Sequence, residues 1–202
     1  MKIRTIVIAA AAALLAASCV PQGRVRPTRN VIFLLTDGTS TSALSVARWY
    51  KQYTQNTDEG LAMDPYYCGL VRVSHTDSPI VGSAGSMTSY MTGELVTTGV
   101  IGVYPKAHPK HDMVEVDTAM TYHPLANLAD VARREQGKSV GVVATTYFCH
   151  ATPAAATAHV YKRSDFHDIA VQMAASDLDV CFGGGGKFIP LARIFQDEIK
   201  WA

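Results

Sequence analysis

Apolar residues follow two spacings along the chain. Short apolar runs at residues 31–35, 67–74, 139–146 and 178–182 are typical of β-strands. Apolar positions three or four residues apart predict helices over residues 42–53, 125–136 and 164–176. Because strands and helices alternate, the pattern predicts an α/β fold: a three-layer sandwich in which helices cover both faces of a mostly parallel sheet.

The segment after the strand at residues 139–146 carries residues that can do chemistry. A helix is predicted to begin in this segment, with Thr152 as its N-cap and Pro153 at the first helical position. This places the Thr152 hydroxyl and the His150 imidazole at the end of a strand, where α/β proteins bind ligands. Arg163 follows about three helical turns later and could act as a forked phosphate clamp. An ordinary capped helix with a surface arginine is the alternative.

Residues 1–19 have the composition of an export signal, with a charged start, an apolar stretch and a small-residue cleavage zone. The apolar part is too short for an easy transmembrane span. The residues before Cys19 resemble the lipobox of bacterial lipoproteins, which predicts a lipid anchor at Cys19 and a place in the periplasm or cell envelope. Cleavage by an ordinary signal peptidase is the alternative. Residues 20–29, with two prolines and three arginines, are interpreted as a tether that precedes the domain at residues 30–202.

The charge balance narrows the range of partners. With 18 Lys and Arg against 17 Asp and Glu, the net charge is +1, and no basic block is present. We therefore expect no nucleic-acid binding, and membrane contact only through the lipid anchor. The cysteines other than Cys19 are odd in number, which leaves room for one disulfide, and are expected to be small buried residues, above all Cys181. The glycines at 183–186 lack a phosphate-loop motif and predict a flexible strand exit.

Three segments carry the strongest functional signal. Residues 30–40 form a predicted strand that ends in Asp37-Gly38, residues 81–93 hold Ser83 at a helix start with Gly93 as C-cap, and residues 150–163 run from His150 to Arg163. In this order and spacing they resemble the alkaline phosphatases, a family of metal-dependent phosphomonoesterases. The resemblance extends from residue 30 to about residue 190. It implies an alkaline-phosphatase-like domain that is C-terminally truncated, because the family's remaining metal ligands would follow the glycine run.

The resemblance implies catalytic roles for two residues. Ser83 matches the serine that is phosphorylated during turnover, whereas Ser78 and Ser86 stand at the wrong distance from the end of the motif. Arg163 matches the clamp that binds the phosphate. Gly82 is a departure, because the family usually has an aspartate there that helps to orient the arginine.

The resemblance also implies a metal centre with two Zn²⁺ ions and one Mg²⁺ ion. Asp37 matches the carboxylate that bridges one zinc and the magnesium, Ser83 matches the nucleophile that zinc coordinates, and Thr152 matches a magnesium ligand. His150 stands at a position that is aspartate in some relatives and histidine in others. It is expected either to support the metal site or to bind a different third ion.

The expected activity is metal-dependent hydrolysis of small phosphate monoesters, and a homodimer is compatible with the complete enzyme. This chain alone is expected to be inactive, because it lacks most of the zinc ligands. One alternative is a non-catalytic fragment or pseudo-enzyme that binds phosphate or a partner. The other is a sulfatase or phosphodiesterase relative, although the chain has no Cys/Ser-x-Pro-x-Arg pattern of the kind sulfatases carry.

Overall fold

The computed structural model describes residues 28–189, which fall into two compact units divided between Thr36 and Asp37. Among these residues the elements are α2 (Thr41–Gln55), η1 (Asp64–Tyr66), α3 (Ser83–Thr92), η2 (Thr118–Met120), α4 (Leu128–Gln136), β1 (Gly141–Tyr147), α5 (Ala151–Ala154), α6 (Phe166–Ala175), β2 (Val180–Gly184) and η3 (Gly186–Phe188). The predicted export signal with Cys19 lies outside the described residues. The α/β class is confirmed.

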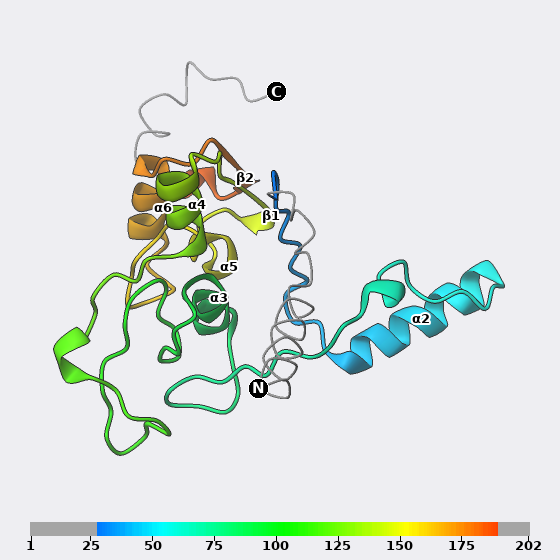
Figure 1. The fold of residues 1–202 in the computed structure, drawn as a ribbon, viewed down its shortest axis with the longest axis horizontal. Helices are drawn as coiled ribbons and strands as arrows, with labels where there is room; N and C mark the ends of the chain where they lie inside the picture. Colours follow the sequence, from blue (N-terminus) through cyan, green and yellow to red (C-terminus); the bar gives the residue numbers. More distant parts are fainter. Residues whose placement is uncertain (1–27, 190–202) are drawn as a thin grey trace, which may run out of the picture. The chain divides into compact units, whose positions relative to one another are not determined.

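β1 and β2 form a parallel pair in which Val142 lies opposite Cys181 (Figure 1). The strands predicted at residues 139–146 and 178–182 are therefore confirmed, and so is their parallel direction. The expected burial of β2 is wrong, because all its residues, including Cys181, are exposed. A sheet face is buried only where other elements pack on it. The buried residues gather instead beyond the carboxyl end of β1, where Phe148 and Cys149 lie.

Polar contacts set α4 against the start of this sheet. Asn127 and Asp130 form a capping box, in which each side chain accepts a hydrogen bond from the other's backbone N–H. At the far end of α4, Arg133 donates to Asp179 Oδ2 at 3.0 Å, and the same oxygen accepts from the Val140 N–H at 2.8 Å. One carboxylate thus links the end of the helix to the residues that precede both strands.

Two other segments with strand-like patterns form no strand. Residues 31–35 belong to the first unit, and their side chains are 38–88 % exposed. Residues 67–74 are also irregular. An apolar run favours an extended backbone, but it becomes a strand only when a neighbour supplies the hydrogen-bonding ladder. Residues 67–74, in the second unit, pair with no strand of that unit among the described residues.

The helix predicted at residues 42–53 is confirmed as α2. Ser40 caps it, because the Ser40 hydroxyl oxygen accepts a hydrogen bond from the Ala43 N–H at 3.2 Å. Arg48 of α2 donates two hydrogen bonds to Asp64 of η1, at 2.8 and 2.5 Å. This hydrogen bonding lowers the pKa of the Asp64 carboxyl. A forked ion pair therefore joins α2 to the turn that follows it.

The helix after β1 is shorter than the sequence predicts. α5 has four residues, and its N-cap is His150, so the prediction that Thr152 caps it is wrong. The chain then leaves the helix, and Val160 pairs with Ile101 in an antiparallel bridge. The expectation that Arg163 follows on the same helix is also wrong. Tertiary pairing outweighs the helix propensity of this alanine-rich segment.

The buried core lies where α3, α5 and α6 come together. α3 packs next to α5, and the helix predicted at residues 164–176 is confirmed as α6 (Figure 1). The core residues are Ala84, Met87, Ile101, Phe148, Cys149, Ala151, Ala154, Ala155, Ala158, Val160, Ile169, Ala170 and Met173. Most of these side chains are small, so the helix backbones can approach one another closely.

The glycine run is not a flexible exit from the strand. Gly183 and Gly184 are part of β2. A Cβ atom on Gly183 would lie 3.0 Å from the backbone nitrogen of Phe148 and 3.1 Å from the carbonyl oxygen of Thr146. Glycine is favoured here because the backbone that leaves β1 approaches β2 closely, and a larger residue would need that backbone to shift.

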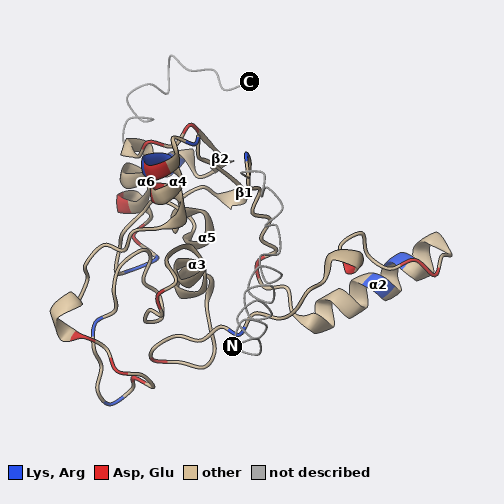
Figure 2. Cartoon of the chain, in the orientation of Figure 1, with Lys and Arg blue, Asp and Glu red and all other residues tan. Residues whose placement is uncertain are grey.

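Charges of both signs are interspersed along residues 28–189, as Figure 2 shows. Within these residues no helix is long and apolar enough to cross a membrane.

The three cysteines in this part of the chain are free, so the disulfide that the sequence leaves room for is not formed here. Cys149 is buried as expected, and burial raises the pKa of its thiol. Cys68 and Cys181 are exposed, which corrects the expectation for both.

Candidate active site

Ser83 and Arg163 are brought together from segments 80 residues apart: Arg163 Nη1 donates a hydrogen bond to Ser83 Oγ at 3.1 Å. Ser83 is the first residue of α3, where free backbone N–H groups favour negative charge. The other two candidate serines are engaged elsewhere. The Ser78 hydroxyl bonds to the backbone of Ile80, and the Ser86 hydroxyl donates to the Gly82 carbonyl. Of the three, only Ser83 bonds to the arginine.

Backbone pairing, rather than a helix, holds Arg163 in place. Ile101 and Val160 exchange two hydrogen bonds of 2.8 Å, and the Arg163 N–H donates to the Gly99 carbonyl, also at 2.8 Å. Gly102 has φ +63°, and a Cβ there would lie only 2.3 Å from the Ala158 carbonyl oxygen. This loop therefore needs glycine at position 102 in order to pass so close to the segment that leads to the arginine.

The same loop is tied to the helix that bears Ser83. The Gly102 N–H donates to Thr88 Oγ1 at 3.1 Å, and Thr88 is fully buried in α3. The serine and the arginine are thus both fixed to the loop at residues 99–102, which holds the two side chains in place relative to each other.

His150 contacts the arginine on its other side. Arg163 Nη2 lies 3.4 Å from His150 Nε2, and the His150 ring stacks on Phe166 with centroids 6.2 Å apart. A Cβ on Gly82 would stand 3.9 Å from Arg163 Nη1, so a carboxylate at that position would be close to the guanidinium. With glycine there, the arginine is oriented by Ser83 and His150 instead.

Asp37 and Thr152 form a second pair, from positions 115 residues apart: Thr152 Oγ1 donates to Asp37 Oδ2 at 2.8 Å. A carboxylate and a hydroxyl are oxygen ligands of the kind that Mg²⁺ accepts, so these two residues fit part of a magnesium site. Zinc is different. Residues 28–189 contain no group of three or more His, Cys, Asp or Glu side chains that could hold a metal ion. The described part of the chain therefore does not fit the expected zinc pair.

His75 is a site residue that the sequence analysis missed. Its ring is 1 % exposed, and its Nε2 accepts a hydrogen bond from the N–H of Gly82, the residue before Ser83, at 2.9 Å. Burial lowers the pKa of His75 and outweighs the opposing effect of the Asp77 charge. No spacing rule signals this residue, because its partner is a backbone amide.

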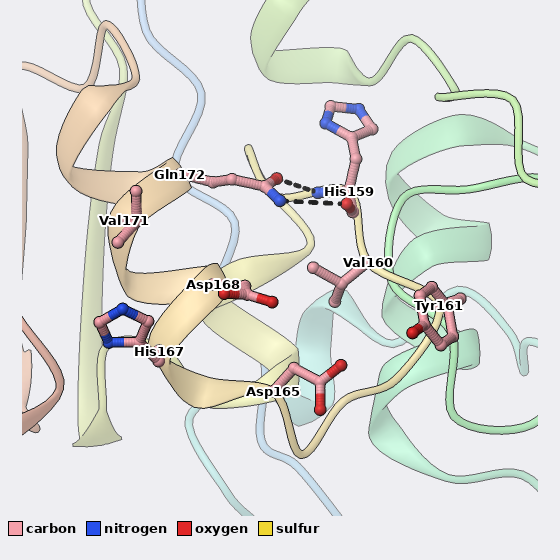
Figure 3. Close-up of a pocket in the computed structure, with 8 residues that line it drawn as sticks. All are labelled: His159, Val160, Tyr161, Asp165, His167, Asp168, Val171 and Gln172. Atoms are coloured by element: carbon pink, nitrogen blue, oxygen red, sulfur yellow. Dashed lines mark hydrogen bonds between the residues drawn. The ribbon is translucent and has the colours of Figure 1, made fainter.

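The structure also has a cavity of about 510 Å³, and none of the site residues described above lines it. Its lining residues are His159, Val160, Tyr161, Asp165, His167, Asp168, Val171 and Gln172 (Figure 3). The Gln172 amide exchanges two hydrogen bonds with the backbone of His159, another lining residue. Figure 3 shows the His167 ring turned away from the Asp165 and Asp168 carboxylates. The cavity is therefore separate from the Ser83 and Arg163 pair.

Comparison with known proteins identifies the family of this chain. The family model described as alkaline phosphatase matches residues 28–197. The tissue-nonspecific alkaline phosphatase of Gallus gallus is 30 % identical over 181 residues, covering 80 % of this chain and 34 % of the relative. The chain thus spans about a third of the length of the curated relatives it matches.

Solved structures of alkaline phosphatases also match this chain. A cold-active alkaline phosphatase from Shewanella sp. matches with a TM-score of 0.66 and 28 % identity, over 80 % of this chain and 37 % of the other. A histidine-to-glutamate variant of the TAB5 alkaline phosphatase matches with a TM-score of 0.52 and 25 % identity, over 73 % of this chain and 37 % of the other. In that variant magnesium is bound in the M3 site.

Proposed function

Because the chain belongs to the alkaline phosphatase family, we propose that the protein containing it hydrolyses small phosphate monoesters through a phosphoserine at Ser83. The observation that carries this proposal is the 3.1 Å hydrogen bond between Arg163 Nη1 and Ser83 Oγ. It pairs a hydroxyl nucleophile at a helix N-terminus with a guanidinium that can bind phosphate oxygens.

The reaction has two steps in this proposal. Ser83 Oγ gives up its proton to solvent and forms a bond to phosphorus while the bond from phosphorus to the ester oxygen breaks, and the leaving alcohol takes up a proton from solvent. Water then attacks the phosphoserine and gives up a proton to solvent, the Oγ–phosphorus bond breaks, Ser83 Oγ regains a proton from solvent, and inorganic phosphate leaves. In both steps Arg163 and the amides at the start of α3 stabilise negative charge on the phosphoryl oxygens.

We propose that the complete enzyme binds two Zn²⁺ ions and one Mg²⁺ ion. Asp37 and Thr152 are the residues that would hold magnesium, and Asp37 and Ser83 would face zinc. Such ions lower the cost of developing negative charge on the attacking and leaving oxygens. His150, which contacts Arg163, is proposed to support this centre rather than to donate a proton.

We also propose that the protein is exported and anchored through a lipid on Cys19, with residues 20–29 as the tether. The supporting pattern is the charged, apolar and small-residue order of residues 1–19. Cys19→Ala should move the protein from the membrane fraction to the soluble periplasmic fraction. If the distribution does not change, ordinary signal-peptidase cleavage is the correct interpretation.

The nucleophile is tested in the intact protein by comparing Ser83→Ala with Ser78→Ala. Ser83→Ala should abolish hydrolysis of a chromogenic phosphate monoester at alkaline pH and leave metal content unchanged. Ser78→Ala is the matched control, because its hydroxyl bonds only to the neighbouring Ile80 backbone. Equal loss in both variants, or full activity in Ser83→Ala, would contradict the assignment.

The alternative of a non-catalytic fragment is tested with residues 20–202 alone, loaded with zinc and magnesium. We expect no turnover, because the described residues supply no zinc-binding cluster. Chelator-sensitive hydrolysis that Ser83→Ala abolishes would show that our account of the metal ligands is wrong.

A further inference from the structure

The His75 ring holds the residue that immediately precedes the proposed nucleophile. Its Nε2 accepts a hydrogen bond of 2.9 Å from the Gly82 N–H, and Gly82 is the N-cap of α3. A ring nitrogen that accepts a hydrogen bond carries no proton, so the neutral ring has its proton on Nδ1. The direction of this bond therefore fixes the tautomer of His75.

Another edge of the ring lies against the first turn of α3. A Cβ on Gly85 would stand 2.3 Å from His75 Cε1 and 2.5 Å from Nδ1. Only a glycine backbone can come this close, so the ring is enclosed between the Gly82 amide and the Gly85 backbone. α3 cannot move toward the ring, and Gly82 cannot turn away without losing its hydrogen bond.

The turn that carries His75 is itself fixed to another segment. The Thr76 N–H donates to the Val96 carbonyl at 3.1 Å. Asp77 Oδ1 accepts two hydrogen bonds from Thr98, one from its N–H at 2.9 Å and one from its hydroxyl at 3.0 Å. His75 therefore projects from a rigid support, which is what a side chain needs in order to hold another group in position.

Burial of the His75 ring is energetically unfavourable in one respect. His75 Nδ1 is buried and has no hydrogen-bond partner in the structure. An apolar side chain of similar size would avoid that cost, since buried polar groups are normally paired. A histidine with an unpaired nitrogen is better explained by its contact with Gly82 than by packing alone.

We propose that His75 is a positioning residue that sets the place of Ser83 through the Gly82 amide. This inference rests on the phosphoserine mechanism proposed above. His75 is buried and bonds to Gly82 rather than to Arg163, so it acts by fixing the backbone from which the Ser83 side chain extends.

The test compares three substitutions of His75 in the intact, metal-loaded enzyme. In His75→Gln, Oε1 is as many bonds from Cα as Nε2 is in histidine, so it can still accept from Gly82. His75→Asn is polar but too short, and His75→Leu fills space without an acceptor. Since a shift of about 1 Å can cost about 100-fold in rate, kcat should fall roughly 10- to 100-fold in the Asn and Leu variants. The Gln variant should retain kcat within about threefold, and KM should stay within about threefold in all three, because Arg163 is untouched.

Hydrogen exchange at the Gly82 amide provides a readout that is independent of activity. The amide should exchange faster in the Asn and Leu variants than in the wild type and the Gln variant. Wild-type kcat in His75→Leu, or no rescue by Gln, would overturn the positioning role, and if Leu does not fold, the Gln and Asn pair decides. Lack of phosphatase activity in the wild-type enzyme would instead refute the proposed function.

Discussion

Gly85→Ala tests the contact between the His75 ring and α3 directly. The added methyl group would lie 2.3 Å from His75 Cε1, where carbon atoms normally stay about 3.5 Å apart. The ring cannot move aside easily, because it is 1 % exposed and bonded to Gly82. Overpacking of this kind costs about 3 kcal/mol at the upper end, whereas alanine in place of glycine favours a helix by about 1 kcal/mol. The net loss should be about 2 kcal/mol.

This loss should appear as faster exchange of the α3 amides. A difference of about 2 kcal/mol corresponds to roughly 30-fold more opening, which mass spectrometry of a peptide covering residues 83–92 can measure. Gly186→Ala is the matched control, because no atom lies within 4 Å of its added Cβ. In a His75→Ala background the cost of Gly85→Ala should largely disappear. Wild-type protection in Gly85→Ala, or an equal loss in both backgrounds, would refute the contact.

Three further predictions concern other parts of the structure. Asn127→Ala removes the capping box of α4 and should lower the free energy of unfolding by about 0.5–2 kcal/mol in denaturant titrations, with Leu128→Ala on the exposed start of the helix as control. Because burial lowers the pKa of folded His75, the unfolded state binds more protons, so stability should fall as the pH drops below about 6.5, and His75→Gln should flatten this dependence. Arg163→Ala removes the donor to Ser83 Oγ and should weaken inhibition by inorganic phosphate about 5- to 150-fold; an unchanged inhibition constant would show that the arginine does not bind phosphate.

The features predicted correctly from the sequence are those that local chemistry determines. α3 begins at Ser83 and has Gly93 as its C-cap, as the motif indicates, because glycine readily adopts the left-handed conformation found there. α4 ends before Gly137 for the same reason. The residues expected to act together also meet in space: Ser83 bonds to Arg163, and Asp37 bonds to Thr152. The order of the motifs was therefore sufficient to predict which residues lie close together, while their roles remain proposals.

The features that were missed depend on contacts between distant segments. The alanine-rich sequence after His150 favours a long helix, yet the chain turns to pair Val160 with Ile101, and no local pattern records that pairing. His75 left no signal because it bonds to a backbone amide, which every residue except proline possesses. Residues 67–74 show the opposite error, since their apolar pattern predicts a strand, yet no strand of the described part of their unit pairs with them and Leu70 and Val71 are exposed.

The wide sequence separation within the site has a consequence during synthesis. Arg163, the partner of Ser83, is synthesised 80 residues after it, and Thr152, the partner of Asp37, is synthesised 115 residues after it. At translation rates of about 5–20 residues per second, these delays last roughly 4–16 and 6–23 seconds. A ten-residue helix is marginal on its own, so α3 becomes stable only after the later segments that form its core have left the ribosome. The contact between Arg163 and Ser83 is thus completed late on the nascent chain, and a pause in translation between codons 83 and 163 would prolong the interval in which the Ser83 hydroxyl lacks its hydrogen bond to Arg163.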